Sequence, residues 1–243
     1  MEMDDPQVAR LSNDTRALLG GIWAERARSE LGAGSGFAQV LVGLYSVGAS
    51  PVVIALAAEA AAQEVEHARA CHRLAEHYLG AAVAMPTPKR VSMPAHRGAD
   101  DPLRAHLHVI GLCCMNESVA ADFVAQCLDV SEARLVRESC STHLRDEIGH
   151  ARVGWAHLGT GMLDMRDRQE IERHLPRMVF ANASLWIERL QMLPEGGVLG
   201  HGYPPRALLH ASALKAFETL VIDGLAACQF DVTASRRELK RLV

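Results

Sequence analysis

Apolar residues recur along most of the chain at spacings of three and four, the period of a helix that buries one face. One such stretch begins after the capping side chains at residues 12–14 and runs to about Tyr45; a second begins at Ser50-Pro51 and ends at Gly80. Their inward positions are Trp23, Ala27, Glu30, Phe37, Leu41 and Leu44, then Ala60, Glu64, His67, Cys71, Leu74 and Tyr78. The pattern predicts an antiparallel helical hairpin with acids and a histidine in its apolar stripe.

A second hairpin is predicted after a proline-rich connection over residues 85–94. A third helix should begin at Asp100-Asp101-Pro102 and continue to about Leu128, and a fourth should run from a cap at Ser131 to about residues 159–161. The inner face of the third helix carries His106, Ile110, Cys113, Glu117, Ala120 and Val124.

Further helices are predicted over about 166–190 and from the end of a Gly/Pro-rich loop, residues 194–205, to about Phe230, followed by a short basic tail. Few stretches show the alternation of a β-strand. We therefore expect an all-α protein with one domain over residues 1–243, in which a core bundle spans about 14–160 and additional C-terminal helices span about 166–243.

Composition agrees with helix packing, because 49% of residues are hydrophobic and only 5% are aromatic. A net charge of -4 without a run of Lys or Arg indicates neither nucleic acid nor an anionic membrane surface as a partner. Residues 1–6 are acidic and lack an apolar signal segment, so we expect a cytoplasmic protein. The apolar tract over residues 40–58 is interrupted by Ser, Gly and Pro, which favours a buried hairpin over a membrane span.

Candidate chemistry is concentrated in the fourth predicted helix. His143, Glu147 and His150 lie at i, i+4 and i+7, so they share one face within an arc of roughly 60°. The chain has one other Glu-x-x-His, formed by Glu64 and His67 in the second helix. Ligand-type groups on an inward stripe need partners, and the two motifs are each other's natural partners.

Helix geometry predicts which further acids reach the same level. Glu30 and Glu64 lie at nearly equal numbers of residues on either side of the turn at Gly48, which leaves a height difference of only about 3 Å. Glu25 would miss this level by roughly 10 Å.

The second hairpin has the same arrangement. Glu117 and Glu147 lie similarly about the turn near Val130, whereas Asp122 is too close to that turn to match. Each hairpin therefore offers one Glu and one Glu-x-x-His.

This pattern resembles the ferritin-like di-iron carboxylate superfamily, in which four helices each offer a Glu and two add a His one turn further on. The resemblance covers about residues 14–160. It implies a four-helix bundle around two iron ions, or two manganese ions, because carboxylates with imidazoles suit these metals and do not suggest a thiolate zinc site. The predicted ligands are Glu30, Glu64, His67, Glu117, Glu147 and His150. No catalytic side chain is predicted beyond the metal ligands.

The additional His143 is similar to the third histidine ligand of the arylamine N-oxygenases, and that resemblance makes it a seventh ligand. A core histidine bonded to a carbonyl, or a group that supports the ligands, is the alternative. By analogy with the superfamily, Asp146 would hold His67 and Gln63 would hold His150. Both could instead be ordinary polar helix residues.

Two groups of small side chains accompany the predicted ligands. Gly32, Gly34 and Gly36 each weaken a helix by about 0.5 to 1 kcal/mol, so either a cavity beside the metals or close helix packing should compensate. Cys71, Cys114 and Cys140 are expected to be reduced thiols that fill the core.

These features predict an oxidoreductase of the monooxygenase or N-oxygenase type. It would take O2 as co-substrate, oxidise a small organic molecule and receive electrons from a reductase or ferredoxin. N-oxygenation, C–H hydroxylation and desaturation stay open, as does the oligomeric state, a homodimer included. The alternatives are a ferroxidase or iron-storage protein and a non-catalytic helical interaction module.

Overall fold

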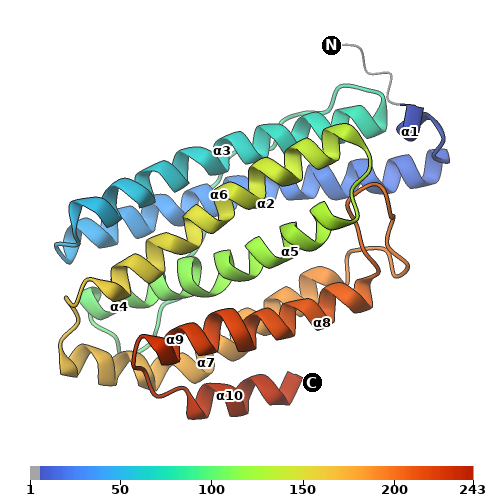
Figure 1. Cartoon of the computed structure of the whole chain (residues 1–243). Helices are drawn as coiled ribbons and strands as arrows, with labels where there is room; N and C mark the ends of the chain where they lie inside the picture. Colours follow the sequence, from blue (N-terminus) through green and yellow to red (C-terminus); the bar gives the residue numbers. More distant parts are fainter. Residues whose placement is uncertain (1–5, 243) are drawn as a thin grey trace.

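The computed structural model describes residues 6–242, and it confirms the prediction of an all-α chain (Figure 1). No strand occurs among the described residues, where the only β-type pairings are the isolated bridges Ser131–Gly200 and Val198–Tyr203. The acidic segment at residues 1–5, on which the expectation of a cytoplasmic protein rests, lies outside the described residues, so that expectation stays a prediction.

The first hairpin has the predicted bounds. After the short helix α1 (Pro6–Ala9), helix α2 spans Asn13–Ser46 and helix α3 spans Pro51–Leu79. Ser12 Oγ accepts the Thr15 N–H, and Ser50 Oγ accepts the Val53 N–H, so both helices begin at capping side chains. Gly80 ends α3 in the left-handed conformation with φ of 66°.

The second hairpin differs from the prediction at its turn. It consists of α4 (Asp101–Val109), the π-helix η1 (Ile110–Glu117), α5 (Ser118–Asp129) and α6 (Arg134–Gly159). The predicted cap at Ser131 is wrong: its hydroxyl donates to the Cys127 carbonyl at 2.6 Å, and α6 begins three residues later without a side-chain cap.

The π-helix was not predicted either, because a period of 3.6 read from sequence does not show where a turn widens. At this place η1 lies directly against α6. A Cβ on Gly154 would overlap Cys114 Sγ and lie 2.8 Å from the Cys114 backbone nitrogen. The missing side chain at Gly154 therefore leaves room for the wider turns of η1.

The C-terminal helices form a layer against α4, η1 and α5 (Figure 1). The predicted helix over 166–190 is α7 (Met165–Leu190); the next predicted helix is divided into α8 (Arg206–Ala216), the π-helix η2 (Phe217–Ile222) and α9 (Asp223–Ala227). The basic tail is also helical, in α10 (Thr233–Leu239) and η3 (Lys240–Leu242). One apolar cluster joins this layer to the second hairpin, including Leu107, Met115, Leu175, Phe217 and Val221.

Two further apolar clusters fill the bundle formed by the hairpins. One contains Trp23, Leu74, Val136 and Tyr203, and the other contains Phe37, Val53, Val109 and Val153. On α2, α3 and α6, the predicted Glu and His ligands lie in sequence between residues of one cluster and residues of the other. Glu117 lies between the two clusters in the same way on the run formed by α4, η1 and α5. The polar site is therefore a layer between two apolar layers.

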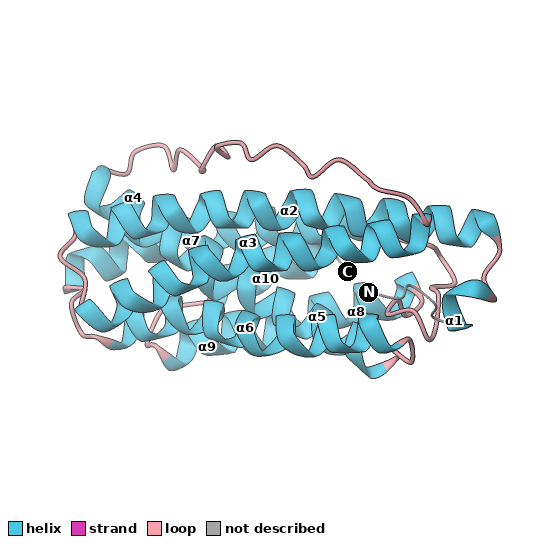
Figure 2. Cartoon of the chain, turned by 90° about the horizontal axis from the view of Figure 1, so that it is seen from above, coloured by secondary structure: helices cyan, strands magenta, loops and turns pink. Residues whose placement is uncertain are grey.

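A long connection, which we call the strap (residues 80–100), runs along the outside of the bundle (Figure 2). It leads into residues Asp101–Asp129, a helical run that is long and apolar enough to cross a membrane by length and composition. Within its most apolar window 56% is buried in the bundle, and it carries the buried Glu117, as a core helix of a soluble protein does.

Candidate metal centre

Four side chains from the two Glu-x-x-His motifs meet at the middle of the bundle. Glu64, His67, Glu147 and His150 are each at most 3% exposed, and one ligand atom from each lies within 4.8 Å of the others. Helices α3 and α6 thus bring together two Glu-x-x-His motifs that are 83 residues apart in the chain. Such a cluster can hold metal ions.

The two carboxylates each reach both histidines. Glu64 Oε2 lies 3.5 Å from His67 Nδ1, and Glu64 Oε1 lies 3.3 Å from His150 Nδ1. Glu147 does the same with distances of 3.6 Å to His67 Nδ1 and 3.3 Å to His150 Nδ1. Since opposite oxygens of one carboxylate face different histidines, each carboxylate could offer a ligand atom beside each imidazole.

The other two acids lie at opposite ends of this group. Glu117 Oε2 is 3.9 Å from His150 Nδ1, on the side of the bundle formed by η1. Glu30 belongs to a second group of ligand atoms within 4.8 Å of one another, which it forms with Cys71 and His143. All four predicted Glu residues therefore surround the same layer.

Both central histidines contact a polar side chain outside the cluster. His67 Nε2 lies 3.2 Å from Asp146 Oδ2, and His150 Nε2 lies 3.0 Å from Gln63 Oε1. When the Nε2–H donates to these oxygens, the lone pair of each ring is on Nδ1, which faces the carboxylates. These are the contacts that the predicted roles of Asp146 and Gln63 require, while the roles themselves stay predictions.

Two buried atoms show that the cluster suits a cation. Glu64 Oε2 and His67 Nδ1, 3.5 Å apart, have no hydrogen-bond partner. A buried polar atom without a hydrogen bond costs about 1 to 3 kcal/mol, whether it is a donor or an acceptor. A metal ion coordinated by both atoms would remove this cost, so the residues present fit a metal.

Without metal ions, bound protons offset the negative charge of the buried carboxylates. Burial, and after it the charge of Glu64, raises the pKa of Glu30 to about 8. Burial and the neighbouring Glu147 also raise the pKa of Glu117 well above its usual range. Burial would raise the pKa of Glu147 as well, but hydrogen bonds with His150 and Glu117 outweigh it and lower that pKa to about 2.

The histidines carry the compensating charge. Burial lowers the pKa of His150, but Glu147 and Glu64 outweigh this effect and raise it to about 11. The same carboxylates raise the pKa of His67 against the effect of burial. Divalent cations would replace these protons, so metal binding here should release protons.

His143 combines features of both predicted roles. Its Nδ1–H donates to the Ser139 carbonyl at 2.8 Å, as expected of a core histidine. This bond leaves the Nε2 lone pair beside Cys71 Sγ, at 3.6 Å, within the group that includes Glu30. Burial, with the charge of His67 next, lowers the pKa of His143 to about 3, so the ring is neutral as a metal ligand must be.

The three glycines of α2 lie in two different surroundings, one of close helix packing and one beside a cavity that no predicted ligand lines. A Cβ on Gly34 would lie 3.3 Å from Glu64 Cβ and 3.5 Å from the Ala61 carbonyl oxygen, so this glycine permits close packing of α2 on α3. Gly32 and Gly36 instead line a cavity.

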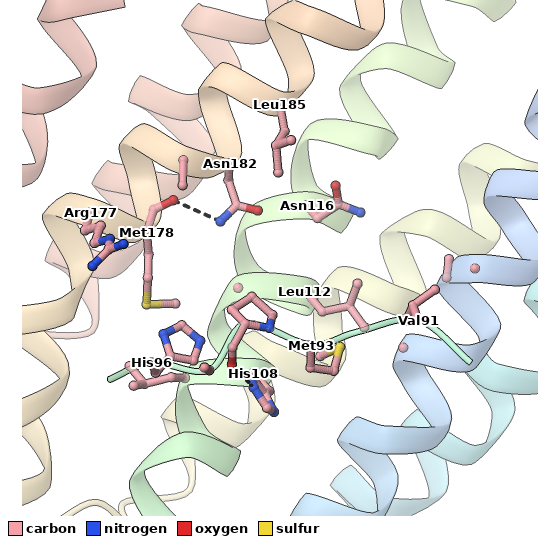
Figure 3. A pocket seen from close by; sticks show the side chains of 18 of the residues that line it. Val91, Met93, His96, His108, Leu112, Asn116, Arg177, Met178, Asn182 and Leu185 are labelled. Atoms are coloured by element: carbon pink, nitrogen blue, oxygen red, sulfur yellow. Dashed lines mark hydrogen bonds between the residues drawn. The ribbon is translucent and has the colours of Figure 1, made fainter. Parts of the chain in front are cut away.

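This cavity has a volume of about 930 Å³ and lies between α2, the strap, the run from α4 to η1, and α7 (Figure 3). Asn116 is one of its lining residues, and Asn116 Nδ2–H donates to Glu117 Oε1 at 3.1 Å. Trp186 Nε1–H donates to Asn116 Oδ1 at 3.1 Å and fixes the amide. The cavity thus comes within one side chain of the candidate metal centre.

Sequence reasoning did not identify several residues of this region. The half-buried Arg26 lies 3.8 Å from Glu30, and its guanidinium stacks on Trp23 at 4.7 Å from the ring centre. Its place one turn before Glu30 was a usable signal. Asn116 could have been noticed as the neighbour of Glu117. No local signal marks the cavity lining, which comes from four separate segments.

No protein-family model matches this chain, and neither a curated protein nor a solved structure matches it. The functional argument therefore rests on the site itself.

Proposed function

We propose that this protein is a ferritin-like, non-haem di-iron oxidoreductase that uses O2 to oxidise a small organic molecule. The observation that carries the proposal is the pair of buried carboxylates, Glu64 and Glu147, each with one oxygen near His67 and the other near His150. Glu30 and Glu117 complete a set of four negative charges, which two divalent ions would neutralise.

The protein residues have separate tasks in this proposal. Glu64, His67, Glu147 and His150 would hold the two ions, with Glu30 and His143 at one and Glu117 at the other. Asp146 and Gln63 orient the histidine rings. When bound, two iron ions would supply reduction of O2 and oxidation of substrate, with electrons from a reductase or ferredoxin. Manganese in place of iron is the alternative metal.

The adjacent cavity favours an oxygenase over a ferroxidase. Its volume of about 930 Å³ is in the range of small-molecule sites, and it comes within one side chain of Glu117. The layer formed by α7 to α10 includes one wall of the cavity, which an iron-storage subunit would not need.

Metal stoichiometry tests the proposal. The full chain, reconstituted anaerobically with iron(II), should hold two irons by elemental analysis, and Glu64→Ala and Glu147→Ala should each hold one or none while keeping their helical circular dichroism. Glu66→Ala is the matched control, because Glu66 on the same helix is exposed and paired with Arg69. A folded wild-type protein that holds fewer than two metals would contradict the dinuclear site. Oxygen uptake without oxidation of any added organic compound would favour the ferroxidase.

A further inference from the structure

The lining of the cavity has an excess of positive charge. It includes five arginines and three histidines but a single acid, Glu25, which forms an ion pair with Arg28. Arg173 pairs with Glu170. The remaining arginines, Arg97, Arg177 and Arg189, form no ion pair with any described residue.

Three histidines line the cavity, and two of them, His96 and His108, lie together at one end of it (Figure 3). The His96 ring lies 5.4 Å from the His108 ring and 5.9 Å from the His174 ring. His96 is held there in the left-handed conformation, with φ of 43°, which is unfavourable for a residue other than glycine. His108 fixes the strap nearby, since its Nε2–H donates to the Pro94 carbonyl at 2.8 Å.

The side chains whose charges act most strongly on His96 are all positive when protonated. Burial first, and then the charges of His108, His174, Arg104 and Arg177, together lower the pKa of His96 to about 4. Among the described residues, the groups of ligand atoms close enough for a metal ion are the two at the bundle centre, and neither includes these histidines. This end of the cavity therefore suits an anion and not a metal ion.

The rest of the cavity leads from these basic groups toward the metal centre. Leu112 and Met178 line it on opposite sides, and Asn116 lies at the far end (Figure 3). His108 and Asn116 are about two helical turns apart, which corresponds to about 10 Å. A molecule that spans this distance would place one end at the basic groups and the other beside the side chain that contacts Glu117.

We propose that the cavity binds a small molecule with an apolar body and an anionic group, a carboxylate or a phosphate, and that Arg177, His174 and His96 hold this group. The apolar body lies along Leu112 and Met178, with the end to be oxidised toward Asn116. That this molecule is the substrate rests on the proposed function; the binding of the anion does not.

The inference is tested with three probes that share a phenyl ring and differ in the charge of the attached group. Benzoate, phenyl phosphate and the neutral benzamide are titrated into the full chain by calorimetry, both metal-free and loaded with iron(II) under anaerobic conditions. Both anions should bind at least about ten-fold more tightly than benzamide, since hydrogen bonds between charged groups are the stronger ones. The preferred anion identifies the group as carboxylate or phosphate.

Arg177→Gln should weaken the better anion about ten-fold or more and leave benzamide unchanged, and Arg177→Lys should recover part of the loss. Arg134→Gln is the matched control, because Arg134 on α6 is 77% exposed, pairs with Glu138 and does not line the cavity. Binding of both anions no tighter than that of benzamide, or unchanged anion binding in a folded Arg177→Gln protein, would overturn the inference. If neither anion binds but the protein holds two irons, this inference is wrong and the proposed function stands. If the anions bind but the protein does not hold two irons, the anion site stands and the proposed function is wrong.

Discussion

At the scale of single residues, His143 is placed where it can act as a ligand or as a structural histidine. Its Nδ1–H is used by the Ser139 carbonyl, and its Nε2 faces the group that contains Glu30. The ring also stacks on His67 with centroids 4.1 Å apart. A hydrogen bond that fixes one nitrogen and presents the other is the arrangement found for metal-binding histidines.

We predict that His143→Ala changes the metal environment while keeping the helices. In cobalt(II)-loaded protein, loss of an imidazole ligand should alter the visible ligand-field spectrum and weaken one of the two metals. His157→Ala is the control, because His157 is a fully buried histidine on the same helix and pairs with His106, outside the site. If His143 is only structural, both variants will melt earlier and give the wild-type cobalt spectrum.

The pair His106 and His157 predicts a pH dependence of stability. His106 Nδ1 lies 2.9 Å from His157 Nε2, and burial lowers the pKa of His106, and that of His157 to about 4. Because both pKa values are lower in the folded state, the unfolded chain binds more protons below its histidine pKa of about 6.5, and the folded state loses stability as pH falls. The loss is at most about 1.4 kcal/mol per pH unit for each histidine, and the part due to His157 ends near pH 4.

This contribution can be isolated with His157→Gln in metal-loaded protein. At pH 7 the variant should be the less stable because it loses the paired ring. The difference in the free energy of unfolding from wild type should then narrow as pH falls from about 6.5 toward 4, as measured by urea denaturation. A constant difference across this range would show that the pair does not titrate as the structure indicates.

At the scale of elements, the contact between η1 and α6 depends on one glycine. A Cβ on Gly154 would overlap Cys114 Sγ and approach the backbone of the π-helix. Because η1 ends at Glu117, a shift of this segment would also move a candidate ligand.

Gly154→Ala should therefore destabilise the protein by about 1 to 3 kcal/mol and reduce its metal content. Gly149→Ala is the control on the same helix, since its Cβ would meet nothing within 4 Å; it should be neutral or stabilise by up to about 1 kcal/mol. Thermal unfolding with elemental analysis checks both. Equal stability of the two variants would mean that α6 and η1 do not pack closely.

At the scale of the whole molecule, the largest apolar cluster connects the second hairpin with the C-terminal layer. Met115 and Val119 belong to it together with Leu175, Phe217 and Val221. Since these helices share a core, we expect one cooperative unit, in line with the predicted single domain.

We predict a single calorimetric transition that Phe217→Ala shifts as a whole. Truncating this side chain, which is 1% exposed, should cost about 3 to 5 kcal/mol and lower the melting temperature by roughly 10 °C. Leu208→Ala on the preceding helix α8 is the control, because Leu208 is 62% exposed and should change stability by no more than about 0.5 kcal/mol. Separation into two transitions would instead show that the C-terminal layer unfolds independently.

Much of this molecule follows from local sequence. The helix bounds at Ser12, Ser50 and Gly80 are encoded in capping residues and a left-handed glycine, whose effects are confined to neighbouring backbone groups. The helical period determines that Glu64 and His67 share a face, and equal distances from a turn bring Glu30 to the same level. These are properties of one helix or one hairpin, so they can be predicted without a structure.

The remaining features depend on segments that meet only in the folded chain. The orientation of Glu64 and Glu147 across both histidines, and the contact of Gln63 with His150, arise from the packing of α3 on α6. The π-helix η1 needs the space beside Gly154. The basic end of the cavity is formed by residues of the strap, α4 and α7 together. Sequence alone determined which side chains were available at the centre of the bundle. Only tertiary packing decided how their atoms face one another, because that depends on contacts between helices far apart in the chain.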